Sequence, residues 1–154
     1  MELADMEKIL DKNVGAFNRR EMNCAESTLK SVCEYIGADD KLLPRIATAF
    51  GGGMGGSQSV CGAVTGALMA LGVMAGREAG GDQTRCKALA SRFLRDFTAE
   101  YGTLTCMGLT GVDMKDPAQM AAFRAPGGKH YTVCTGCVRW ACMYMARLKE
   151  EENL

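Results

Sequence analysis

Cysteine is the residue that offers this sequence the most chemistry, because its thiolate both binds metals and attacks disulfides. The chain has eight cysteines in 154 residues. Three of them, Cys33, Cys86 and Cys142, fall in apolar helical stripes, where cysteine commonly serves as a small buried hydrophobe. The other five are the candidates for function. They are Cys24, Cys61, Cys106, Cys134 and Cys137.

Three of these candidates are expected in the first turn of a helix. Cys24 follows Asn23, Cys61 opens a glycine-striped segment, and Cys134 opens the last helix. A helix N-terminus carries partial positive charge and unpaired N–H donors, which stabilise a thiolate. If these starts converge, they form an electropositive pocket for several sulfurs, and Cys106 could join them from a loop.

The spacing leaves several chemistries open. Four thiolates could hold an iron–sulfur cluster or a zinc ion, whereas two close thiols, with Cys24 and Cys61 as the candidates, could cycle between dithiol and disulfide. Only Cys134 and Cys137 form a local C-x-x-C, and Val138 replaces the histidine that covalent haem attachment needs. The sequence thus predicts a metal or cluster centre for electron transfer, a metal-free dithiol oxidoreductase, or a zinc- or small-molecule-binding helical module.

A glycine run, GGGMGG at residues 51–56, precedes Cys61. Gly51, Gly53 and Gly56 satisfy G-x-G-x-x-G, but no second strand follows Glu78 as a dinucleotide fold requires. Glycines also permit positive φ and a close backbone approach to a bound group. We therefore expect the run to contribute cofactor-binding positions. They are Gly52, Gly53, Gly55 and Gly56.

The single histidine excludes a site built from several histidines. His130 could add a ligand beside Cys134, but we expect it to be an exposed loop residue. The methionines are scattered over expected helices and are typical of core filling.

The surrounding pattern predicts an all-α protein, since good helix formers are plentiful and β-branched residues are few. Apolar residues recur at helical spacing from Leu3 to Phe17 and again after Asn23, which with Glu26 resembles a capping box. Further helices are expected in the ranges 44–50, 60–75 and 83–101, with caps at Ser57 or Ser59 and at Asp82. A loop is expected over 102–115, a short helix after Asp116–Pro117, and a last helix capped by Thr132.

Gly62, Gly66 and Ala70 form a smooth stripe on the 60–75 helix, which lets another helix approach closely. We therefore expect a compact single domain over 1–154, a bundle of about five to six helices with this Gly/Ala-striped helix at its centre. The same stripe could also pack against a second subunit as a homodimer.

Charge and hydropathy exclude some classes. Lys+Arg and Asp+Glu both number 18, which argues against a nucleic-acid binder. The apolar stretch from Val60 to Gly76 is shorter than the roughly 20 residues of a membrane span. The first residues show no secretory signal, so we expect a cytoplasmic protein whose cysteines are not a disulfide framework.

The segment Cys61-Gly62-Ala63-Val64-Thr65-Gly66 carries a family resemblance, together with residues 23–26, 46–56 and 102–106 and a late cysteine before Val138. Over roughly residues 20–147 the chain resembles the C_GCAxxG_C_C family, which is called redox-active for its cysteine pattern. The resemblance implies four site cysteines at Cys24, Cys61, Cys106 and Cys134, with Cys137 as the substitute for the last. It also implies an unidentified redox partner and a link to a transport system. An iron–sulfur centre is the leading expectation, with zinc or no metal as alternatives.

Overall fold

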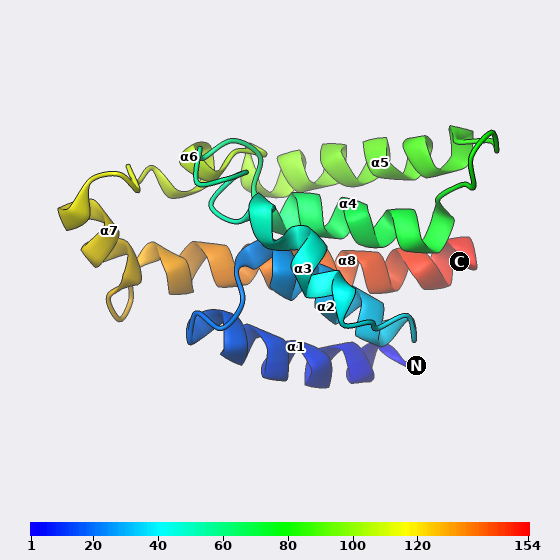
Figure 1. Cartoon of the computed structure of the whole chain (residues 1–154), viewed down its shortest axis with the longest axis horizontal. Coiled ribbons are helices and arrows are strands. Elements are labelled where there is room, and N and C mark those ends of the chain that lie inside the picture. The colour runs from blue at the N-terminus through cyan, green and yellow to red at the C-terminus, as the bar shows by residue number, and fades with distance from the viewer.

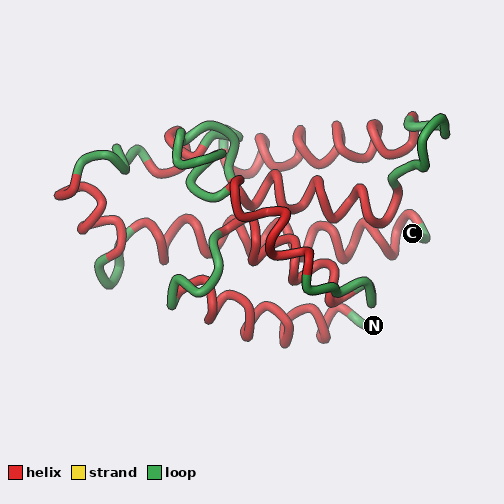
Figure 2. Tube along the Cα trace, in the orientation of Figure 1, coloured by secondary structure: helices red, strands yellow, loops and turns green.

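The elements are helices joined by turns, without a strand, in a computed structural model that describes residues 1–154 (Figure 1 and Figure 2). The α-helices are α1 (Leu3–Asn18), α2 (Cys24–Tyr35), α3 (Leu42–Ala47), α4 (Gly62–Ala75), α5 (Thr84–Tyr101), α6 (Cys106–Thr110), α7 (Pro117–Arg124) and α8 (Thr135–Glu152). A 3₁₀ turn, η1 (Thr48–Phe50), extends α3, and a π-helical segment, η2 (His130–Cys134), leads into α8. The all-α class is confirmed.

The expected count of five to six helices was too low, because it left out α6 and did not fully count the short helices expected at α3 and α7. Helix α6 lies inside the segment that was expected to be a loop. Its first turn is capped by Thr105, whose hydroxyl accepts a hydrogen bond from the Gly108 N–H at 2.9 Å. A five-residue helix has too few apolar positions for its periodicity to stand out in sequence.

The caps explain where several helices begin. Asn23 Oδ1 accepts from the Glu26 N–H at 2.9 Å, as the sequence predicted. Asp116 Oδ1 accepts from the Ala118 N–H at 2.9 Å and so caps the short helix that was expected after it. Two expected caps were wrong. Neither Ser57 nor Ser59 caps α4, which begins at Gly62 after Cys61, and Thr132 lies inside η2 rather than before a helix.

The closest helix pair is α2 and α4, which meet along the glycine stripe. A Cβ on Gly66 would lie 2.7 Å from the Ala25 carbonyl oxygen and 3.0 Å from Thr28 Cβ, and one on Gly62 would overlap Cys24 Sγ. Helix α4 also packs against α5 and α8, while α2 packs against α1, α3 and α8. The predicted close approach to this stripe is confirmed.

A cluster of 26 buried apolar residues fills the space between these helices. Aromatic rings join α5 to α8, with the Phe93 and Phe97 rings 6.1 Å and 5.5 Å from the Trp140 ring. In Figure 1, α1, α4, α5 and α8 run along the long axis, and α6 and α7 lie at one end of the molecule. No helix combines the length and the apolar character that crossing a bilayer requires.

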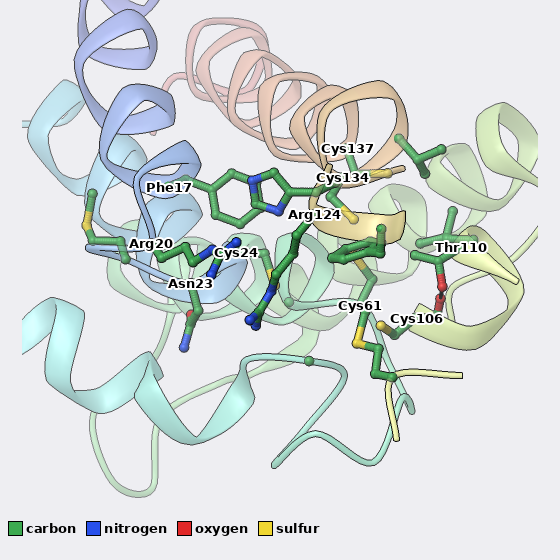
Figure 3. Close-up of a pocket in the computed structure, with 18 of the residues that line it drawn as sticks. Phe17, Arg20, Asn23, Cys24, Cys61, Cys106, Thr110, Arg124, Cys134 and Cys137 are labelled. Carbon is green, nitrogen blue, oxygen red and sulfur yellow. Dashed lines mark hydrogen bonds between the residues drawn. The ribbon is translucent and has the colours of Figure 1, made fainter. Parts of the chain in front are cut away.

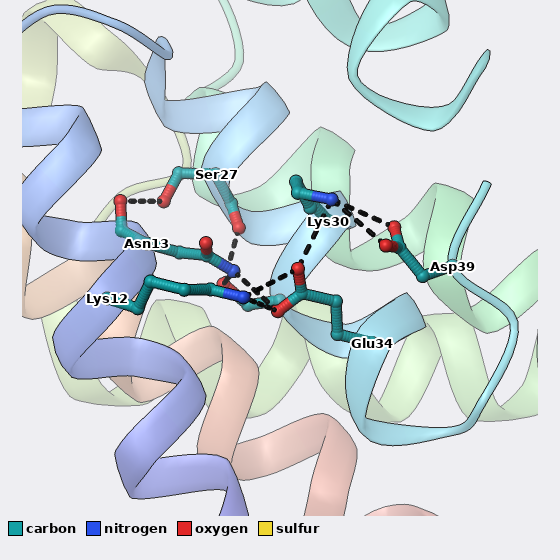
Figure 4. A network of polar contacts seen from close by, with 7 residues as sticks. Lys12, Asn13, Ser27, Lys30, Glu34 and Asp39 are labelled. Atoms are coloured by element: carbon teal, nitrogen blue, oxygen red, sulfur yellow. Dashed lines mark hydrogen bonds and ion pairs between the residues drawn. The ribbon is translucent and has the colours of Figure 1, made fainter. Parts of the chain in front are cut away.

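A polar network ties α1 to α2 (Figure 4). The buried Asn13 side chain donates to Ser31 Oγ at 3.1 Å and to Glu34 Oε2 at 3.2 Å. The backbone carbonyl of Asn13 accepts a hydrogen bond from Ser27 Oγ. Lys12 pairs with the same Glu34 carboxylate at 2.8 Å. Because every buried polar atom has a partner, the network fixes the register of the two helices without an unpaired group.

The α2–α4 contact predicts opposite effects of one substitution at two glycines of the same helix. Gly66→Ala should lower the free energy of unfolding by about 1–3 kcal/mol, because the added methyl group overlaps the α2 backbone. Gly72→Ala should raise it by up to about 1 kcal/mol, because a Cβ there meets nothing within 4 Å and alanine favours the helix. Urea unfolding of both variants tests this, and equal effects would contradict the close packing.

Candidate functional site

All five candidate cysteines line one cavity of about 350 Å³ (Figure 3). The cavity lies where the α1–α2 turn, the start of α4, and the segments α6, α7 and η2 meet. Apolar side chains form much of its wall, including Phe17, Leu109 and Phe123. The structure thus brings together sulfurs that are distant in sequence, while Cys33, Cys86 and Cys142 lie outside the cavity. The chemical roles of the five remain predictions.

Cys24 lies at the first residue of α2, with its sulfur over Gly62 of α4. Burial and the neighbouring Cys61 raise its pKa to about 11, although backbone N–H groups of Gly52, Ala25 and Gly62 hydrogen-bond to the sulfur and oppose the rise. The sequence analysis expected helix starts to favour the thiolate. The donors are present at Cys24, but desolvation outweighs them.

Cys61 and Cys137 line the same cavity, and Cys137 is the thiol that affects Cys61 most strongly. A side-chain hydrogen bond with Cys137, together with burial, raises the pKa of Cys61 well above its usual value, against the smaller effect of the Ala63 and Val64 N–H groups. Cys137 is 1% exposed and Cys61 9% exposed, so Cys61 is the more accessible of the two. Burial is the main cause that raises the pKa of Tyr101, and the neighbouring Cys137 adds to the rise.

Cys106 and Cys134 complete the group from α6 and η2. Burial raises the pKa of Cys106 to about 12, with further contributions from Cys61 and Cys24. Burial likewise raises the pKa of Cys134, and Cys61, Cys24 and Cys106 add to the rise. Each of these thiols therefore disfavours the negative charge of its neighbours, and the cavity holds them as neutral thiols at neutral pH.

The glycine run forms a left-handed turn. Residues 52–56 all have positive φ, and the turn is closed by backbone hydrogen bonds such as Gln58 N to Gly52 O at 2.9 Å. Gly52 lines the cavity, and a Cβ on Gly53 would lie 2.7 Å from Cys106 Cβ. Gly55 and Gly56 do not line it. Of the four predicted cofactor-binding glycines, the structure therefore brings two to the cysteines.

His130 is buried rather than exposed, so its expected surface position was wrong. Its ring stacks at 4.3 Å on Phe17, and Nε2 lies 3.2 Å from Asn18 Oδ1. Burial lowers the pKa of His130, as do the charges of Arg20 and Arg124. The ring is therefore neutral at pH 7, and it forms part of the cavity wall.

Sequence reasoning did not single out Arg20 and Arg124, which also line the cavity. Neither belongs to a motif, and their meeting depends on how α7 folds back toward the end of α1. Figure 3 shows both side chains near Asn23 and Cys24. The positive φ of Arg20, 62°, is a signal that only the structure could give.

The side chains of the cavity do not converge on a single metal ion. No group of three or more His, Cys, Asp or Glu side chains is arranged so that it could hold one. A zinc site of the usual tetrahedral kind therefore does not fit the side chains as they stand. The arrangement that the structure does contain is the Cys61–Cys137 pair, with three further thiols around it.

A family model described as "Putative redox-active protein (C_GCAxxG_C_C)" matches residues 22–148 of the chain. No curated protein and no solved structure matches it. The matched range contains every cysteine of the cavity, the glycine run and Arg124, whereas Arg20 lies just before its first residue.

The raised pKa values predict how the cavity thiols respond to pH. Because the pKa of Cys24 is about 11 and that of Cys61 is higher than usual, little thiolate exists at pH 7. Alkylation of both by iodoacetamide should accelerate about tenfold per pH unit through pH 8–9.5, as peptide mapping by mass spectrometry would measure. An unstructured peptide with one cysteine, the control, should level off within this range because its pKa is about 8.5, and a plateau below pH 8 for Cys61 would contradict the assignment.

Proposed function

The chain belongs to the C_GCAxxG_C_C family, and we propose that it is a thiol redox protein in which Cys61 and Cys137 form a reversible disulfide. The observations that carry the proposal are that both side chains line one cavity and that Cys137 is the foremost influence on the Cys61 thiol, whose pKa it raises. Two thiols that interact in this way need only a small movement to form a bond. The sequence analysis expected Cys24 and Cys61 as the redox thiols. The proposed pair keeps Cys61 and replaces Cys24 with Cys137.

The different exposure of the two thiols assigns their order of reaction. Cys61 is the more exposed, so its thiolate attacks a substrate disulfide, forms a mixed disulfide and releases one substrate thiolate. The Cys137 thiolate then attacks the Cys61 sulfur and releases the second. Two protein thiols are oxidised, one disulfide is reduced, and two protons leave the protein for the departing thiolates or the solvent.

Tyr101 serves this cycle as a positioning residue. Its side chain reaches toward Cys137 from the last turn of α5, while the Phe97 ring packs against its ring at 4.7 Å. An anchored hydroxyl holds the Cys137 sulfur toward Cys61 and leaves the cavity side of Cys61 open to substrate.

The proposal predicts which cysteines become linked. Oxidation of the reduced protein with diamide should remove two thiols and yield one Cys61–Cys137 disulfide, which peptide mapping identifies. Cys61→Ser and Cys137→Ser should each abolish that link, whereas Cys86→Ser should leave it unchanged, since Cys86 lies outside the cavity. A disulfide between other residues in the unchanged protein would overturn the assignment.

A second candidate is an iron–sulfur protein for electron transfer, with Cys24, Cys61, Cys106 and Cys134 as the ligands. The observation in its favour is that all four line the same cavity, and that backbone N–H groups reach the sulfurs of Cys24 and Cys61. Such hydrogen bonds tune the potential of a thiolate-bound cluster. A cluster is larger than a single ion, so its ligands need not converge on one point.

Metal analysis separates the two candidates. If the cluster is present, anaerobically purified protein should contain iron and acid-labile sulfide, and Cys106→Ser should lose both while Cys137→Ser keeps them. Protein that contains neither, yet forms the Cys61–Cys137 disulfide, would exclude the cluster in favour of the dithiol.

A further inference from the structure

Two arginines without partners stand at the opening of the thiol cavity. Arg20 and Arg124 line it and are exposed, and neither takes part in an ion pair or a side-chain hydrogen bond. The adjacent Arg19 contrasts with them, because its guanidinium pairs with Glu21 at 2.8 Å. Both unpaired charges lower the pKa of His130, so both lie near that ring in the cavity wall.

The backbone at Arg20 adds an independent observation. Arg20 follows the C-cap of α1 with φ of 62°, in the left-handed region where glycine is the usual residue. An arginine there is strained, and strain of this kind is concentrated at functional sites. The conformation directs the chain from α1 toward α2 and leaves the Arg20 side chain at the cavity.

The other charged groups around the opening leave this positive charge in place. His130 is neutral, since burial and both arginines lower its pKa. Glu21 is already paired with Arg19, and Glu26 forms no ion pair with either Arg20 or Arg124. The guanidinium groups are therefore free to bind an anion, and arginine is well suited to carboxylates.

The rest of the cavity sets the size and polarity of the ligand. Its volume of about 350 Å³ suits a small molecule, and Phe17, Phe123 and Met120 supply apolar walls. We propose that the substrate is a small disulfide that bears a carboxylate, bound by Arg20 and Arg124 with its sulfurs toward Cys61. This inference rests on the proposed dithiol function and adds the class of substrate.

Three disulfides of similar length and different charge test the proposal. They are 3,3′-dithiodipropionate, bis(2-hydroxyethyl) disulfide and cystamine, which are anionic, neutral and cationic. The rate of the reduced protein with each probe is divided by the rate of 2-mercaptoethanol with the same probe. This normalised rate should be about tenfold higher for the anionic than for the cationic probe at low salt. Added salt should reduce this ratio.

Variants assign the preference to the arginines. Arg20→Gln and Arg124→Gln should each reduce the anionic-to-cationic ratio severalfold, while Arg147→Gln, an exposed arginine without a partner on α8, should not. Arg20→Gly should reduce the ratio without lowering the urea midpoint, because glycine relieves the left-handed conformation. That variant separates recognition from folding.

The outcomes distinguish a failure of this inference from a failure of the proposed dithiol function on which it rests. Equal normalised rates for all three probes, with a Cys61–Cys137 disulfide formed, would overturn the substrate class alone. If no probe reacts, the dithiol function fails, and calorimetry with 3,3′-thiodipropionate, which cannot exchange, decides the anion site. Binding that Arg20→Gln and Arg124→Gln abolish would support it, and absence of binding to the unchanged protein would overturn it.

Discussion

The contact between α2 and α4 is the constraint on which the cavity depends. With only hydrogen at Gly62 and Gly66, the backbone of α2 reaches the surface of α4, and Cys24 comes to rest over the first turn that follows Cys61. A wider helix spacing would separate the two sulfurs and open the wall behind them. Packing at the centre of the molecule thus bears on the chemistry at its end, since these two helices belong to the core and also place Cys24 and Cys61.

Burial, rather than helix polarity, sets the state of the thiols. Backbone donors reach Cys24 and Cys61, but removal from water outweighs them, and the pKa values rise. When the thiolate is not stabilised, the reduced dithiol has no advantage over the disulfide. The disulfide is therefore comparatively stable. A protein of this kind suits the donation of electrons to disulfides better than their removal from thiols.

Local signals in the sequence predicted much of this arrangement. Asn23 was identifiable as a cap and a helix was expected after Asp116, because both signals are confined to one helical turn. The glycine stripe was visible because its period matches the helix. Thr132 carries the same local signal of a cap, but it lies inside a π-helical segment that starts before it. This segment depends on contacts with Asn18 and Phe17, which are distant in sequence. The burial of His130, the pairing of Cys61 with Cys137 and the meeting of Arg20 with Arg124 are tertiary effects. No spacing along the chain encodes them.

Trp140 is the sole tryptophan of the chain, and its ring lies 6.0 Å from that of Tyr101, which touches Cys137. Sulfur in a disulfide quenches indole emission at short range, and a tyrosine that loses its thiol partner changes the polarity around the indole. Under the dithiol function proposed above, the molecule carries its own optical reporter, with Tyr101 between the indole and the reacting sulfur. Its oxidation state can be followed in real time by intrinsic fluorescence, without a dye attached to any of the cysteines.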